Sequence, residues 1–185
     1  MFPKHVLMIF VWFLSFPAIG GSPSATATAE RYLHAMIQED HEGMAAEMHP
    51  DALNRFKALI YPLFSGKSAD QATKNLLPLF DGVSSLRELD ALNAAQFYTS
   101  FFRGVMKVKP DFSDAIRSSR IKVLGEVREG DLSHVVYRLK MNVGDVAVSQ
   151  VTVLPLQKMG GSWGVLLTME SEQVAQNLRN ALDKT

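Results

Sequence analysis

Residues 120–169 read RIKVLGEVREGDLSHVVYRLKMNVGDVAVSQVTVLPLQKMGGSWGVLLTM and are rich in valine, leucine, isoleucine and aromatic side chains. The sequences REGD, VGD and KMGG interrupt this stretch, and glycine-containing sequences of this kind are typical of tight turns between strands. Strands joined in order by short turns form an antiparallel meander. We therefore expect four strands, over residues 120–131, 133–145, 146–161 and 162–169.

The second of these strands has one apolar face and one polar face. The apolar face carries Val135, Tyr137, Leu139, Met141 and Val143. The other face carries His134, Arg138, Lys140 and Asn142, with Val136 as an apolar exception. We expect the first face to pack on the core and the second to contact water. An alternative for Arg138 and Lys140 is that they bind an anion or a partner.

The chain before the strands shows helical spacing, beginning with Ala29, Leu33, Met36 and Ile37. We expect helices over residues 29–39, 41–48, 50–64, 68–80 and 86–106, and a last one over 171–182. The longest is apolar nearly all round, which is typical of a buried central helix. The order of elements indicates an α+β fold, with N-terminal helices packed on a curved four-stranded antiparallel meander and a C-terminal helix. We expect one such domain over 29–185, after a linker at 21–28.

Residues 38–50, QEDHEGMAAEMHP, contain the densest group of histidines and carboxylates in the chain. If the first helix continued through this stretch, Asp40 would lie in its buried stripe, where an unpaired carboxylate is costly. We therefore expect the helix to end near Glu39 and Asp40 to cap a new helix. His34 and His41 then no longer share a helix face, so we expect no metal site here.

The first residues have the three-part layout of a secretory signal peptide: Lys4, the apolar run VLMIFVWFLSF, and small residues up to Gly20. A membrane anchor or a buried core helix is the alternative, but the run is shorter than the roughly 20 residues that span a membrane. We expect export to a periplasm or outside the cell, with cleavage after Gly20 or a few residues later, and no membrane span in the mature protein. The chain has no cysteine, which excludes disulfides and thiolate metal sites.

The charge of the chain is balanced, because 19 lysines and arginines face 19 aspartates and glutamates. The basic residues are scattered along the sequence, so we expect no nucleic-acid binding. Neither the serine-containing nor the glycine-containing turns have the strand–turn–helix context of a nucleophile elbow or a phosphate loop. We expect no cofactor.

Residues 27–53, ATAERYLHAMIQEDHEGMAAEMHPDAL, resemble the opening of nuclear-transport-factor-2-like domains, the group that includes ketosteroid isomerase and SnoaL-like proteins. Asp40, His49, Pro50 and Asp51 lie where that pattern places them, and residues 120–169 are similar to the closing sheet of the group. The segments 68–80 and 171–182 are additions to the minimal fold. The resemblance implies a cone-shaped domain with a pocket between sheet and helices, and it implies no particular activity.

Large aromatic residues on both predicted layers are the candidates for the wall of such a pocket: Tyr98, Phe101, Phe102, Tyr137 and Trp163. They either fill the core or line a cavity that takes a small apolar ligand. We expect an exported binding or accessory module without catalysis, which holds a small apolar ligand or a protein partner, with a homodimer through the sheet among the options. The alternative is a small lyase, isomerase or hydrolase that uses His34 or Asp40 with Tyr98.

The signal-peptide interpretation predicts the mass of the exported protein. Protein recovered from the exported fraction should lack residues 1–20, because a short apolar run with a small-residue tail suits signal peptidase. Intact mass spectrometry measures this directly. Protein that retains Met1 and sediments with membranes would contradict the prediction.

Overall fold

The structure is a computed structural model, and it describes residues 24–65, 69–144 and 146–182. The predicted signal peptide and its cleavage site lie outside these residues. The helices before the sheet are α1 (Ala25–Ile37), α2 (His41–Glu47), α3 (Pro50–Ile60), α4 (Ala69–Leu76), α5 (Leu86–Ala91), α6 (Ala94–Val108) and α7 (Pro110–Arg117). Short 3-10 turns follow α3 (Tyr61–Phe64) and α4 (Leu77–Leu79). The strands are β1 (Arg120–Glu129), β2 (Leu132–Val143), β3 (Val146–Met159) and β4 (Ser162–Val165), and α8 (Met169–Leu182) follows them.

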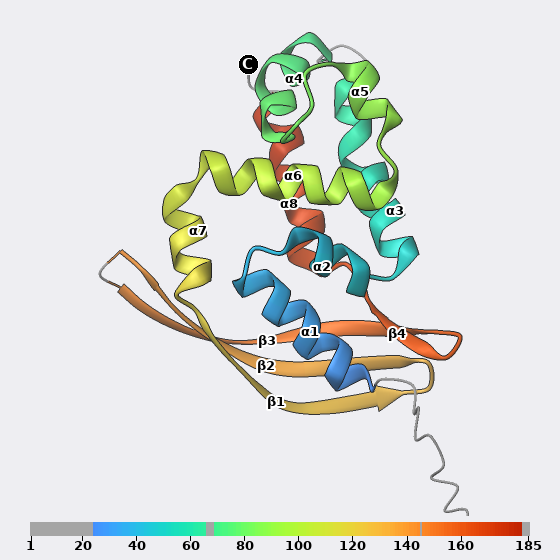
Figure 1. The fold of residues 1–185 in the computed structure, drawn as a ribbon, viewed down its shortest axis with the longest axis vertical. Helices are drawn as coiled ribbons and strands as arrows, with labels where there is room; N and C mark the ends of the chain where they lie inside the picture. Colours follow the sequence, from blue (N-terminus) through green and yellow to red (C-terminus); the bar gives the residue numbers. More distant parts are fainter. Residues whose placement is uncertain (1–23, 66–68, 145, 183–185) are drawn as a thin grey trace, which may run out of the picture.

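The strands form one four-stranded antiparallel sheet in the order β1-β2-β3-β4, which confirms the meander. The turns between them use Gly130, Gly144 and Gly160, each with a positive φ that favours glycine. Figure 1 shows α1 and α2 lying over one face of the sheet and α6 crossing above them. The predicted α+β class is therefore confirmed.

The strand register confirms which face of the sheet is buried. Val135 pairs with Leu154, and both side chains are buried under the helices together with Tyr137. Arg138, on the other face, pairs with Val151, and both side chains are exposed. The inner face thus belongs to the core, and the outer face has no helix over it in Figure 1.

The chain turns sharply between α1 and α2. Glu39 takes a φ of 55°, and the Asp40 side chain accepts a hydrogen bond of 2.9 Å from the Gly43 amide. This confirms Asp40 as the cap of α2. Gly43 suits its place, because an added Cβ would lie 2.3 Å from the Asp40 carboxylate.

The helix layer is joined to the sheet where α2 meets α3. The His49 amide donates to the Val165 carbonyl oxygen at 2.8 Å, and Met48 forms a parallel bridge with Val165. A Cβ on Gly164 would lie 2.7 Å from the His49 Cα, so only glycine allows this approach. The resulting contact holds β4 against the helices.

The predicted helix over 86–106 is wrong in its extent, because the chain breaks at Leu92 and Asn93. Asn93 and Gln96 form a capping box that starts α6 anew, and Leu92 is extended. The helix α7, which begins at Pro110, is an element that the sequence analysis did not predict. The first helix begins at Ala25 instead of residue 29, because Ser24 caps it by accepting from the Ala27 amide.

Replacing Asp40 tests the cap. Asp40→Ala should lower the free energy of unfolding by about 1 kcal/mol, because the Gly43 amide loses its partner. Asp40→Asn should cost much less, because asparagine caps nearly as well. Chemical denaturation of the variants measures both values. Equal stability of Asp40→Ala and the unchanged protein would contradict the role of the cap.

Candidate functional site

The residues of the predicted acid/base alternative do not share a surface. His34 is exposed on α1, where its Nε2 lies 3.4 Å from the side-chain Nε2 of Gln38. Asp40 is exposed and holds the Gly43 amide. Tyr98 is buried, and its hydroxyl lies 3.2 Å from that of Tyr32. Burial raises the pKa of Tyr98 well above its ordinary value, so this phenol stays protonated.

The predicted pocket aromatics divide into two groups. Tyr98, Phe101 and Phe102 of α6 gather around Phe56 of α3, with ring centroids between 5.3 and 5.7 Å from it. Tyr98 and Phe101 meet the Phe56 ring edge to face, an arrangement that aromatic rings prefer, and the Phe102 ring is tilted by 31° to it. From the sheet, Tyr137 is buried on β2, and Trp163 on β4 lies under the Arg128 guanidinium at 5.3 Å. The structure brings the helix aromatics together and places Trp163 elsewhere.

A groove of about 380 Å³ runs between α2 and α6. Its lining is made of Glu42, Ala45, Ala46, Ala95, Gln96, Thr99, Ser100 and Arg103. Alanine side chains provide apolar surface there, and the charged residues Glu42 and Arg103 belong to its wall. The volume is within the range of small-molecule sites, roughly 300–1,000 Å³.

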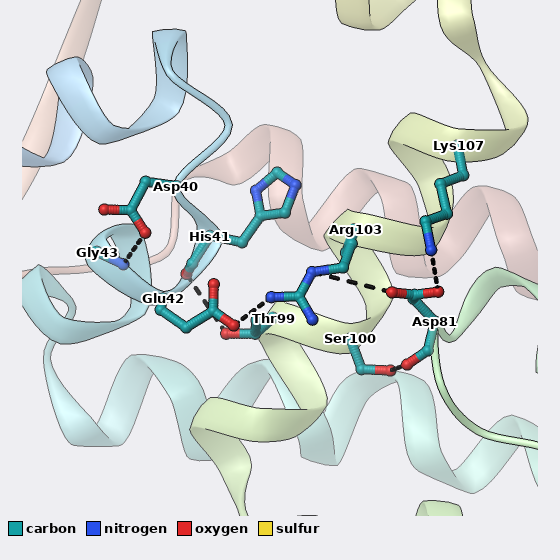
Figure 2. Close-up of polar contacts among 9 residues, drawn as sticks. All are labelled: Asp40, His41, Glu42, Gly43, Asp81, Thr99, Ser100, Arg103 and Lys107. Atoms are coloured by element: carbon teal, nitrogen blue, oxygen red, sulfur yellow. Dashed lines mark hydrogen bonds and ion pairs between the residues drawn. The ribbon is translucent and has the colours of Figure 1, made fainter.

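An alternating chain of charges borders this groove, as Figure 2 shows. Arg103 bonds to Glu42 and lies 3.9 Å from Asp81, which binds Lys107 at 2.5 Å. The hydrogen bond from Lys107 holds the pKa of Asp81 below its ordinary value, and the one from Arg103 does the same for Glu42. Each carboxylate of this chain is therefore paired with a basic side chain.

The other polar groups of the groove are also occupied from within the protein. Thr99 donates to the His41 carbonyl oxygen at 3.4 Å, and Ser100 donates to that of Asp81 at 2.8 Å (Figure 2). The Gln96 side chain accepts from the Asn93 amide. A polar ligand would therefore have to displace existing bonds. The groove has the volume of a site but no polar side chain without a partner.

His41 is the exception among the buried polar groups near the groove. Its side chain is 3% exposed, and its Nδ1 has no hydrogen-bond partner among the described residues. Burial lowers its pKa; Arg103 lowers it further, while the carboxylates of Glu39, Glu42 and Asp40 oppose the shift. The ring is therefore neutral in the folded protein at neutral pH.

Neither a metal cluster nor a membrane-spanning helix is found in the part of the chain that the structure describes. No group of three or more histidine, aspartate or glutamate side chains there is arranged to hold a metal ion. None of the described helices is both long and apolar enough to cross a bilayer.

The outer face of the sheet differs from the groove because its apolar side chains are uncovered. Five of these side chains form what we call the outer strip: Leu124, Val127, Val136, Val151 and Val153. Val127 is 55% exposed, Val151 52% and Val153 46%, although each lies within a strand. Val136 pairs with Val153 and also faces Gly125, beside the β-bulge at Leu124, so the strip is continuous across β1, β2 and β3. Sequence analysis identified only Val136 as an apolar exception on this face.

Comparisons with known proteins give a distant similarity to a solved structure. No family model and no curated protein matches the chain. Among solved structures it is similar to an NTF-2-like protein of unknown function from Shewanella oneidensis, with 11% identity, a TM-score of 0.40, and coverage of 76% of this chain and 89% of that one. A likeness so distant says nothing about what the chain binds.

The neutral, buried His41 predicts a pH dependence of stability. Its pKa in the folded protein lies below the ordinary value of 6.5, so below that pH the unfolded chain binds a proton that the folded protein does not. The contribution of the neutral His41 to the free energy of unfolding is therefore present above pH 6.5 and is lost as the pH falls. Melting temperatures between about pH 7 and about pH 5 should fall less steeply in His41→Leu than in the unchanged protein. The exposed His34→Gln is the matched control, and equal slopes in all three proteins would contradict the prediction.

Proposed function

We propose that this chain is an exported, non-catalytic binding module that takes a protein partner on the outer strip. The observation that carries the proposal is the exposure of Val127, Val151 and Val153 on the face of the sheet opposite the buried side chains of Val135, Leu154 and Leu156. Contiguous apolar surface of this kind on a sheet commonly marks a binding site for another protein.

The residues of the catalytic alternative do not come together in the part of the chain that the structure describes, and this supports binding over catalysis. His34 and Asp40 are exposed, whereas Tyr98 is buried and paired with Tyr32. The α2–α6 groove supplies volume, but its polar side chains already hold internal partners. The outer strip, in contrast, carries apolar side chains that gain free energy only if another surface covers them.

The second candidate is a small apolar ligand held among Tyr98, Phe101 and Phe102, the predicted pocket residues that the structure brings together. Trp163, which the sequence predicts to line the same pocket, lies against Arg128 instead. Mass spectrometry of small molecules released from the native protein tests that candidate separately. A bound apolar molecule whose release loosens the aromatic cluster would favour it over the outer strip.

Site-directed photo-crosslinking in the native host tests the protein-binding proposal. A crosslinking amino acid at Val151 should give a discrete covalent adduct, because the strip is in contact with its partner; the same amino acid at the exposed Arg87 of α5 is the control. The additional change Val153→Asp should reduce the adduct by about tenfold, because a charge buried at an apolar interface costs more than 1.4 kcal/mol. Mass spectrometry identifies whether the partner is another protein or a second copy. Equal labelling at both positions, or none at Val151, would overturn the proposal.

A further inference from the structure

Four basic residues lie together on the outer face of the sheet, next to the outer strip. We call them the cation block: Arg120 and Lys122 of β1, and Lys140 and Arg138 of β2. The register pairs Arg120 with Lys140 and Lys122 with Arg138 directly across the two strands. Paired residues point to the same side of a sheet, as do residues two apart in a strand.

The residues that alternate with the cation block along β1 and β2 establish on which face of the sheet the block lies. Ile121 pairs with Leu139, and Val123 pairs with Tyr137; these side chains pack against the core. The four basic residues alternate with them and are all exposed, so they lie on the face opposite the helices. Their Cβ atoms are expected at the corners of a rectangle of about 5 by 7 Å.

The cation block has no internal counter-charge among the described residues. None of its side chains takes part in an ion pair, a hydrogen bond or a ring contact there, whereas Arg31, Arg103, Lys107, Arg117 and Arg128 all have acidic partners. Like charges placed directly opposite one another on a sheet destabilise it. Repulsion among the four cations therefore lowers the stability of the fold, and no acidic side chain among the described residues offsets it.

Protection of an exposed sheet edge does not account for the block. Lysine and arginine on an edge strand prevent pairing with other chains, and this explanation fits Arg120 and Lys122 on β1. It does not fit Arg138 and Lys140, because β2 lies between β1 and β3 and has no free edge.

We propose that the cation block binds an anion that carries two or more phosphate groups. Arginine and lysine are the usual phosphate-binding side chains, and the expected spacing suits adjacent phosphates. Arg120 and Lys140 also line a hollow of about 520 Å³ together with Asn142 and Ser149, whose amide and hydroxyl groups can donate to phosphate oxygens. Ser118 lines it too, but its hydroxyl donates to the Ala115 carbonyl oxygen. The source of the phosphates is a soluble polyphosphate or the headgroups of an anionic phospholipid surface. The site adjoins the outer strip, because Arg138 pairs with Val151, but it is formed by different side chains and does not depend on the proposed partner.

Two binding measurements on the purified full chain distinguish these sources. Calorimetric titration with tripolyphosphate at low salt tests the soluble ligand. Co-sedimentation with vesicles of phosphatidylglycerol and phosphatidylcholine, compared with phosphatidylcholine alone, tests the lipid surface. Binding in either arm should weaken as salt is added, because the block is exposed to solvent.

The variant Lys122→Glu/Arg138→Glu should weaken this binding by about tenfold or more, because two charge-assisted contacts become repulsive. Lys74→Glu/Arg87→Glu changes the net charge equally on α4 and α5 and should leave binding within about twofold of the unchanged protein. Circular dichroism checks that both variants fold. Failure of both tripolyphosphate and anionic vesicles to bind, or equal loss in the two variants, would overturn the proposal. Neither result bears on crosslinking at Val151.

Discussion

The backbone reverses between α1 and α2, where Glu39 has a φ of 55° and Asp40 accepts the hydrogen bond of the Gly43 amide. Because the chain turns here, α1 can lie along the inner face of the sheet while α2 packs against α6. The short α2 then delivers His49 to Val165, where the helix layer is bonded to β4. Both the α2–α6 groove and the position of β4 therefore depend on this turn.

The interactions within the helix layer are almost entirely internal. The aromatic rings around Phe56 fill the space between α3 and α6, and the charges of Glu42, Arg103, Asp81 and Lys107 neutralise one another beside the groove. A layer whose charges and rings are paired in this way offers few groups to a ligand. The neutral ring of His41 is the polar group in it that lacks a partner at Nδ1 among the described residues.

The outer face of the sheet has the opposite character. Valine side chains that could be buried are exposed, and cations that could be paired lie beside one another. The balance of 19 basic and 19 acidic residues conceals this, because net charge describes the whole chain and binding depends on local potential. A neutral protein can thus present one face suited to apolar and anionic partners.

The sequence alone determined the features that depend on neighbouring residues: the Asp40 cap, the turns around Gly130, Gly144 and Gly160, and the α+β order of elements. The prediction of one helix over 86–106 missed the break at Asn93, because α5 and α6 together show a continuous apolar pattern that hides the capping box of Asn93 and Gln96. Only the tertiary structure decided that Tyr98, Phe101 and Phe102 pack around Phe56, since ring orientation follows from helix packing. It also decided that basic residues scattered along the sequence form a block, because antiparallel pairing brings Arg120 beside Lys140 and Lys122 beside Arg138. The register of this hairpin depends on the geometry of its turn and on the bulge between Val123 and Gly125, and residue spacing within a strand does not contain it.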